Sequence, residues 1–211
     1  MAEAYVIEAL RTAGGRRNGA LRDWHPVDMG AAVIDALIPK TGIDPAAVED
    51  VIVGCVSQVG EQSFHIGRSM VLASVLPQSV PAVTIDRQCG SSQQALHFAA
   101  QAVMSGTQDV VLAAGVEHMT RVPMGSPTML AIQAGVGKGP WSAALLEKFG
   151  VTLAEFQPNK LTQIIHLLRF LFAQPHTVSL LQNQFINFHS VMTNLQWHYR
   201  RYLVLSQWEM N

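Results

Sequence analysis

The sequence predicts an α/β fold, with a mixed and mostly parallel sheet that carries helices on its faces. Short β-branched runs alternate with segments in which apolar residues recur at helical spacing. Each strand and its following helix take about 25–30 residues, which is the pattern of a sheet whose helices connect parallel strands. Glycine and proline stand between most of these segments and separate them.

Taken in order along the chain, the β-branched runs predict strands over 4–9, 51–56, 80–86 and 110–114. The apolar periodicity predicts helices over 26–38, 66–75 and 90–105. Pro39 and Gly42 are expected to stop the first helix, and Asp44 before Pro45 predicts an N-cap and a short helix. Residues 120–150 carry many glycines and prolines, so they predict an irregular region with short helices.

Composition excludes several classes of protein. The 211 residues have a formal net charge of -1, which provides no basic surface for nucleic acid. Two cysteines argue against a disulfide scaffold and fit a reducing compartment. We expect no signal peptide, no transit peptide and no membrane span, and therefore a cytoplasmic location. No spacing of histidine and cysteine resembles a zinc site, so no metal is expected.

The composition changes abruptly near residue 157. All 16 glycines lie within residues 1–150, although turns and helix ends of an independent domain prefer glycine. Residues 1–156 hold 14 acidic and 10 basic side chains, whereas 157–211 hold one acidic and four basic ones. We therefore divide the chain into an α/β core over 1–120, an irregular loop region over 121–156 and a helical or disordered tail over 157–211.

Cys89 stands where a predicted strand passes into a predicted helix. A thiol near a helix N-terminus feels unpaired N–H groups and the positive end of the helix dipole, and both favour thiolate. Gly90 and Ser91 leave room for a substrate to approach the sulfur, and the same N–H groups could donate to an oxyanion. The sequence alone leaves a second interpretation open, in which Cys89 is a buried structural residue.

The segment around Cys89 resembles the nucleophilic cysteine segment of thiolases, the acetyl-CoA acetyltransferases and 3-ketoacyl-CoA thiolases. The resemblance extends in register over residues 4–155 and covers the N-terminal half of that family only. The matching segments are ALRT at 9–12, DVIVGCVSQVG at 50–60, Arg68 with Leu76 and Pro77, DRQCGSSQQA at 86–95, AGVEHMT at 114–120 and Pro123. Ala114, His118 and Thr120 depart mildly from the family pattern.

This resemblance implies acyl transfer between an acyl-CoA, such as acetyl-CoA or a 3-ketoacyl-CoA, and coenzyme A. Cys89 would be the nucleophile that holds the acyl group as a thioester. Coenzyme A thioesters would be substrates, with no cofactor bound. The intact family implies a homodimer or tetramer.

The resemblance also implies that essential parts are missing. In thiolases a second α/β half supplies a Gly-His-Pro histidine and a Cys-x-Gly cysteine, and residues 157–211 contain no glycine at all. His65, His97 and His118 are candidate substitutes for the base, although His97 would lie about 12 Å along its helix from Cys89. We therefore expect a truncated form that is inactive alone.

Two other functions stay open. One is a non-catalytic thiolase-like fragment or dimerisation partner. The other is a relative of the condensing enzymes of ketide and fatty acid synthesis, although Glu117, Met119 and the Gly60-Glu61-Gln62 turn favour a thiolase. For the tail, a membrane-surface helix over 161–172 is one hypothesis, and aberrant or frameshifted sequence is the other.

Overall fold

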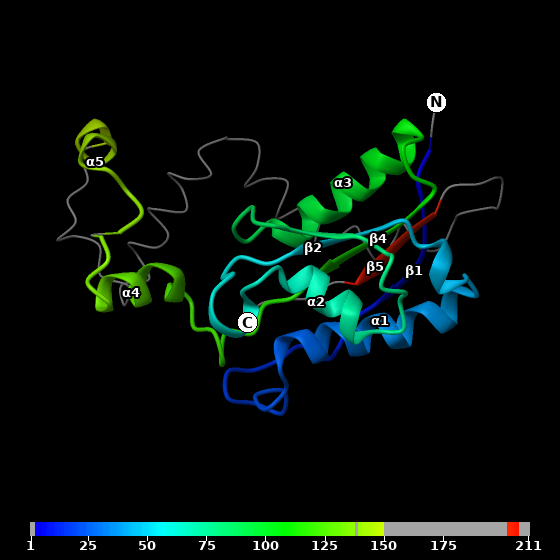
Figure 1. Cartoon of the computed structure of the whole chain (residues 1–211), viewed down its shortest axis with the longest axis horizontal. Coiled ribbons are helices and arrows are strands. Elements are labelled where there is room, and N and C mark those ends of the chain that lie inside the picture. The colour runs from blue at the N-terminus through cyan, green and yellow to red at the C-terminus, as the bar shows by residue number, and fades with distance from the viewer. Residues whose placement is uncertain (1–2, 138, 150–201, 207–211) are drawn as a thin grey trace. The chain divides into compact units, whose positions relative to one another are not determined.

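A five-stranded parallel sheet forms the centre of the computed structural model, which describes residues 3–137, 139–149 and 202–206 (Figure 1). Its strands lie in the order β1-β5-β4-β2-β3, and each pairing between these neighbours is parallel. The strands are β1 (Tyr5–Leu10), β2 (Asp50–Gly54), β3 (Ala82–Ile85), β4 (Val110–Gly115) and β5 (Tyr202–Ser206). The predicted α/β class with a mostly parallel sheet is confirmed.

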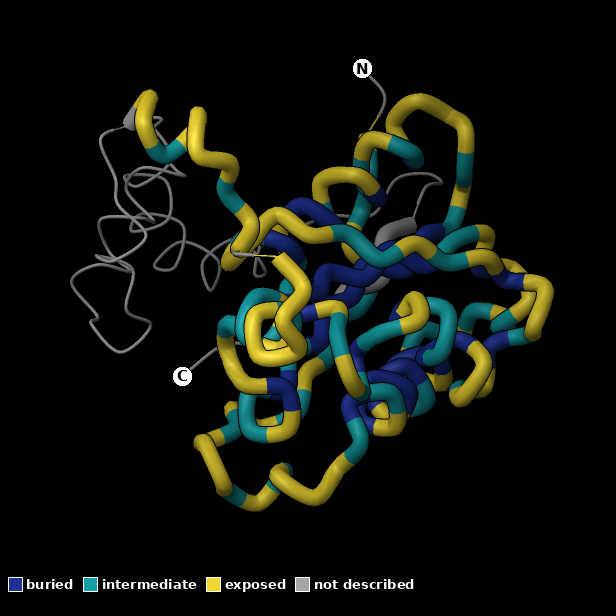
Figure 2. Tube along the Cα trace, turned by 60° about the vertical axis from the view of Figure 1, so that its left-hand side comes forward, coloured by how far each residue is buried: buried dark blue, intermediate teal, exposed yellow. Residues whose placement is uncertain are grey.

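Helices cover both faces of this sheet. Helices α1 (Pro26–Thr41) and α2 (Ile66–Ala73) pack on one face, and α3 (Ser91–Ser105) packs on the other (Figure 1). Successive side chains of a strand point to opposite faces. Accordingly, Val51 and Val53 of β2 belong to the core beneath α1 and α2, whereas Ile52 belongs to the core beneath α3. Figure 2 shows the buried residues along the strands and the inner sides of the helices.

The helix ends follow the predicted chemistry with one exception. Asp44 accepts a hydrogen bond from Ala46 N at 2.9 Å and caps the short 3-10 helix η1 (Pro45–Ala47), as predicted. Gly42 ends α1 in the left-handed conformation, with φ of 67°. The prediction that Pro39 stops this helix is wrong, because Pro39 lies inside its last turn and the helix continues to Thr41. A second 3-10 helix, η2 (Gly60–Gln62), precedes α2.

Strand β5 comes from the part of the chain for which the sequence predicts a helical or disordered tail. Tyr202 lies beside Tyr5 of β1 on one side and beside Val110 of β4 on the other. Residues 202–206 therefore form an interior strand of the sheet, between β1 and β4, where the sequence predicts a helical or disordered tail. The other residues of 157–211 lie outside the described part of the chain.

The chain divides into two compact units. The first comprises Met1–Leu130 with Arg200–Asn211 and contains the sheet, and the second comprises Ala131–Tyr199. The short helices expected in the irregular region are α4 (Ser126–Gln133), which runs across the boundary, and α5 (Ala143–Phe149) in the second unit.

Candidate functional site

Cys89 lies in the connection between β3 and α3, two residues before the first residue of the helix. Its side chain is exposed, so the alternative of a buried structural cysteine is wrong for this position. The N-cap of α3 is Gly90, which provides no side-chain hydrogen bond to the first turn. The sequence-predicted geometry is therefore present: an accessible thiol precedes a helix N-terminus that no side chain caps.

The turn that carries Cys89 is held by short polar side chains. Gln88 adopts a left-handed conformation with φ of 48°, which is uncommon for a residue other than glycine. Its N–H donates to Asp86 Oδ1 at 2.6 Å. Ser91 Oγ accepts from Arg87 N at 2.9 Å and donates to the carbonyl oxygen of Gln88 at 2.6 Å. These bonds connect the end of β3 to the start of α3 and define where the thiol is presented.

Cys55, the second thiol, follows β2 directly and lies in a contrasting environment. It is only 1% exposed, and Gln62 Nε2 lies 3.5 Å from its sulfur. Burial raises the pKa of the Cys55 thiol to about 12, and the carboxylates of Glu117 and Asp86 add to this effect. Since the thiolate is the nucleophile, Cys55 is a packed small residue, as predicted, and not a reactive one.

Glu117 organises the loop after β2 from a distance in the sequence. Its carboxylate accepts from Val56 N at 2.8 Å, from Ser57 N at 3.3 Å and from Gln62 Nε2 at 3.0 Å. Gln62 is itself fully buried, and its Oε1 accepts from His118 N at 2.6 Å. The sequence singled out Glu117 and Gln62 only as parts of matching segments, and this network was missed.

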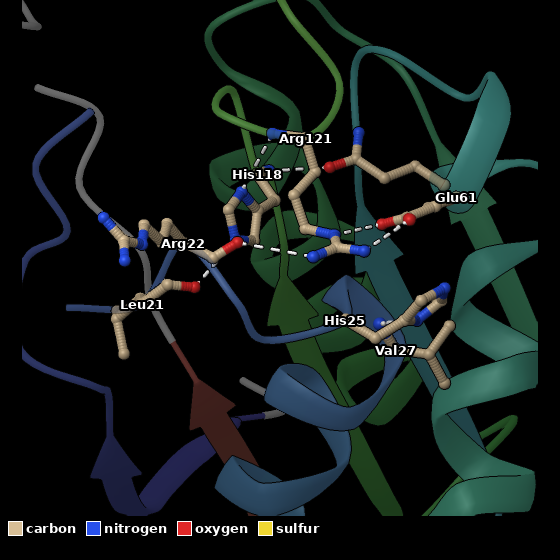
Figure 3. A network of polar contacts seen from close by, with 8 residues as sticks. Leu21, Arg22, His25, Val27, Glu61, His118 and Arg121 are labelled. Carbon is tan, nitrogen blue, oxygen red and sulfur yellow. Dashed lines mark hydrogen bonds and ion pairs between the residues drawn. The ribbon is translucent and has the colours of Figure 1, made fainter. Parts of the chain in front are cut away.

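The loop after β4 is fastened to the first loop of the chain and to η2 (Figure 3). His118 is 6% exposed; its Nε2 lies 2.9 Å from the carbonyl oxygen of Leu21, and its Nδ1 lies 3.4 Å from Arg121 N. The two contacts fit one neutral tautomer that donates from Nε2 and accepts at Nδ1. Both ring nitrogens are thereby engaged, so His118 has a structural role and is a poor candidate for a base acting on Cys89.

Arg121 and Glu61 form an ion pair in the same region (Figure 3). Arg121 Nη2 donates to Glu61 Oε1 at 2.6 Å, and Nε donates to the other carboxylate oxygen. The hydrogen bonds from Arg121 lower the pKa of the Glu61 carboxyl. Arg121 Nη1 also reaches the carbonyl oxygen of Arg22 at 3.4 Å. Together these contacts hold η2, the first loop and the loop after β4 as one assembly.

The three other histidines of the core stand at helix N-caps or within a helix. His65 is exposed and adopts a left-handed conformation, with φ of 62°, at the N-cap of α2. His97 is exposed on α3. His25, which sequence reasoning overlooked, accepts from Val27 N at 3.3 Å through Nδ1 and caps α1. Within the described residues, no group of three or more potential metal ligands is found, and no helix has the length and apolar character needed to cross a bilayer.

Comparison with known proteins places residues 4–156 in the family model described as thiolase, N-terminal domain. The chain is 55% identical to steroid 3-ketoacyl-CoA thiolase FadA6 of Mycobacterium tuberculosis over 135 residues, which is 64% of this chain and 33% of that protein. It is 38% identical to a 3-ketoacyl-CoA thiolase of Pseudoalteromonas translucida over 152 residues, which is 70% of this chain and 39% of the relative. An acetyl-CoA acetyltransferase structure from Bacillus anthracis matches 50% of this chain and 27% of its own, with 35% identity and a TM-score of 0.48.

The chain thus spans about a third to two-fifths of the length of these curated relatives. The matched residues include every segment on which the sequence resemblance depended, from the first strand to the loop after β4. The family match extends over more than half of the chain. This chain therefore belongs to the thiolase family, of which it carries the N-terminal domain.

Proposed function

We propose that this chain is the nucleophile-bearing part of a thiolase-type acyltransferase, and that Cys89 is its acyl-accepting residue. The observation that carries the proposal is the exposed Cys89 thiol at the start of α3, within the segment that matches the thiolase N-terminal domain. The substrates would be acyl-CoA thioesters and coenzyme A. No bound cofactor or metal is required for this step.

The proposed step is a transfer between two thioesters. The Cys89 thiolate attacks the thioester carbonyl of an acyl-CoA, the bond from that carbon to the coenzyme A sulfur breaks, and coenzyme A thiolate leaves and takes a proton. With a 3-ketoacyl-CoA, attack at the keto carbon breaks the carbon–carbon bond instead. The acetyl-CoA carbanion that leaves then needs a proton from an acid. The N–H groups at the start of α3 would stabilise the negative charge that develops on the carbonyl oxygen.

Full turnover should be absent from the chain alone. Positioned proton transfer contributes on the order of 100- to 10,000-fold to such reactions. The family's second-half histidine and cysteine have no counterpart in 157–211, and His118 is engaged in structural contacts. We infer a truncated thiolase with an α/β core over 1–120, a loop region over 121–156 and an aberrant tail over 157–211. The same proposal includes a cytoplasmic location and, as in the intact family, assembly into a homodimer or tetramer.

A non-catalytic fragment or dimerisation partner is the second candidate. The observation that favours it is that residues 157–211 contain no Gly-His-Pro and no Cys-x-Gly segment, and that both ring nitrogens of His118 are engaged in structural contacts. On this alternative, Cys89 would be accessible but would not retain an acyl group.

Intact-mass spectrometry after incubation with acetyl-CoA separates the two candidates. An acetyl adduct should form on the wild type and on Cys55→Ala, and not on Cys89→Ala. A steroid-derived acyl-CoA is a useful second donor, because one relative is a steroid 3-ketoacyl-CoA thiolase. Absence of any adduct on the wild type would favour the non-catalytic fragment. Thiolysis of acetoacetyl-CoA near the typical enzyme median of about 10 per second would refute the expected inactivity and show that the chain contains an unassigned base.

A further inference from the structure

Two glycines face each other at the carboxyl ends of neighbouring strands. Gly54 ends β2 and Gly115 ends β4, and the parallel register pairs them directly. Each stands two residues after a member of the core beneath α3, because Ile52 precedes Gly54 and Ala113 precedes Gly115. Since side chains alternate along a strand, any side chain at these two positions would point toward α3.

The start of α3 occupies the space that those side chains would need. A Cβ atom on Gly54 would lie 2.4 Å from both the carbonyl carbon of Ser91 and the nitrogen of Ser92. A Cβ atom on Gly115 would lie 1.9 Å from Ser92 Oγ and 2.8 Å from Ser92 Cβ. These separations are far below van der Waals contact, so the glycine pair forms a notch that accepts the first turn of the helix.

The notch is connected to Cys89 through the turn before the helix. Ser91 Oγ is bonded to Arg87 N and to the carbonyl oxygen of Gln88, on either side of the left-handed Gln88. A displacement of Ser91 and Ser92 must therefore move the residues that carry the thiol. A Cβ atom on Gly54 would clash with backbone, which cannot move aside, whereas the two atoms too close to a Cβ atom on Gly115 belong to the Ser92 side chain.

We infer that Gly54 and Gly115 are positioning residues for Cys89: their shared notch sets the depth at which the first turn of α3 lies on the sheet, and so the place of the thiol. This inference rests on the proposed function of Cys89. It adds that two strand-end glycines, distant from Cys89 in sequence, control how readily the thiol takes an acyl group.

The test compares Gly54→Ala and Gly115→Ala with the full-length wild type. Acetylation of Cys89 by acetyl-CoA should slow by at least about tenfold in each, since misplacement of a reacting group by about 1 Å can cost 100-fold. Alkylation of Cys89 by iodoacetamide across a range of pH should change by about two- to fivefold, the range of helix-terminus effects. The alkylation arm needs no thioester. It therefore still tests the notch if the wild type accepts no acyl group, in which case the proposed function fails separately.

A compensating substitution distinguishes positioning from general damage. Ser92→Gly removes both atoms with which an alanine at position 115 would clash, so Gly115→Ala combined with Ser92→Gly should regain the rates of Ser92→Gly alone. The same substitution should not rescue Gly54→Ala, whose added methyl group meets backbone atoms. Gly30→Ala is the matched control: its Cβ would lie 2.5 Å from Met70 Cε in α2, on the other face of the sheet, so it disturbs packing without touching the notch.

Labelling of buried Cys55 in the same samples reports unfolding. If Cys55 in an alanine variant is labelled as fast as in the unfolded protein, Ser92→Thr is used in place of that variant. This substitution adds one methyl group to the side chain that faces Gly115. The inference is supported if Cys89 reacts more slowly in the alanine variants while Cys55 stays protected, and if the double variant regains its rate. Wild-type rates in Gly115→Ala or in Ser92→Thr, or equal slowing in Gly30→Ala, overturns it.

Discussion

The carboxyl ends of β2 and β3 are neighbours in one sheet, and each is followed by a cysteine in an opposite environment. After β2, Cys55 is enclosed by a loop whose N–H groups are bound by the carboxylate of Glu117. After β3, Cys89 stands exposed in a turn held by its own neighbours in sequence. In this sheet, the thiol after β2 is buried where Glu117 binds the following loop, and the thiol after β3 is accessible in a turn held by local bonds. The two turns therefore differ in whether a distant side chain closes them.

The largest expected effect is the difference in reactivity between the two thiols. With a pKa of about 12, only about one Cys55 thiol in ten thousand is ionised at pH 8. Because Cys89 is exposed and Cys55 is buried and poorly ionised, Cys89 should be alkylated by iodoacetamide more than about tenfold faster than Cys55 in the folded chain. Peptide mapping after timed labelling measures both rates, and a urea-unfolded sample provides the control in which the two should converge. Similar rates in the folded chain would remove the contrast.

Opening the loop after β2 should reduce the difference in reactivity between the two thiols by exposing Cys55. Glu117→Ala leaves the N–H groups of Val56 and Ser57 and the amide of Gln62 without their acceptor. We expect a loss of roughly 2–3 kcal/mol in the free energy of unfolding, because the lost bonds involve a charged acceptor. Urea denaturation measures this loss, and Cys55 labelling should accelerate in parallel.

Glu147→Ala, at an exposed position of α5, is the matched control and should stay within about 0.5 kcal/mol of the wild type. A Glu117→Ala variant as stable as this control would show that the loop is closed by packing alone.

Alkaline pH should lower the free energy of unfolding, because the buried Cys55 thiol is stable in the fold only in its neutral form. The folded-state pKa of Cys55 is raised to about 12 from an ordinary value of 9.0, so the folded state holds its proton longer than the unfolded state does. The stability that depends on the neutral thiol is complete below pH 9 and is lost progressively between pH 9 and 12. We expect this loss at about 1 kcal/mol per pH unit.

Cys55→Ala and Cys55→Ser lack the titrating thiol, so their unfolding free energies should fall less steeply over the same window. The slopes are compared, since both substitutions also alter packing. Identical slopes in all three proteins would contradict the assignment.

The smallest expected effect concerns the ion pair at the edge of the network. Arg121 lowers the pKa of Glu61, so the pair stabilises the fold at neutral pH and loses this contribution as pH falls through the folded-state pKa. Arg121→Gln should lower the melting temperature by at most about 4 °C at pH 7, because exposed ion pairs contribute little. Scanning calorimetry from pH 7 into the acid range should show the difference at pH 7 and its progressive loss as the Glu61 carboxylate is protonated. A difference in melting temperature that does not change with pH would show that Arg121 stabilises the fold through packing and not through the ion pair.

Much of this architecture was predictable because its signals are local. Asp44, Gly42 and Gly106 fix helix ends through capping and left-handed backbone, and alternating β-branched runs mark β2 to β4. The position of Cys89 before α3 followed from the same local pattern, whereas its exposure did not, because the sequence left a buried Cys89 open. Pro39 misled because the hydrogen bond that its missing N–H removes does not end the helix: α1 continues to Thr41, and the left-handed Gly42 ends it.

What the sequence could not reveal depends on contacts between distant segments. Glu117 binds the N–H of Val56 from sixty-one positions away, and no pattern around either residue indicates this pairing. The notch of Gly54 and Gly115 can be recognised only from the register of β2 and β4, which pairs the two glycines. Strand β5 was missed for a related reason, since its place between β1 and β4 comes from the sheet and its surroundings in sequence resemble no strand-rich domain.

The position of β5 also has a consequence for how the chain matures on the ribosome. Among the described strands, β1 pairs only with β5, so the first strand to be synthesised joins the sheet through the last. Until residues 202–206 have left the exit tunnel, β1 has no neighbour to accept its backbone hydrogen bonds. Closing so long a loop is slow, because contacts between the two ends carry the highest entropic cost. Nascent chains should therefore wait with β2, β3 and β4 assembled, with one edge of β4 and both edges of β1 left unpaired.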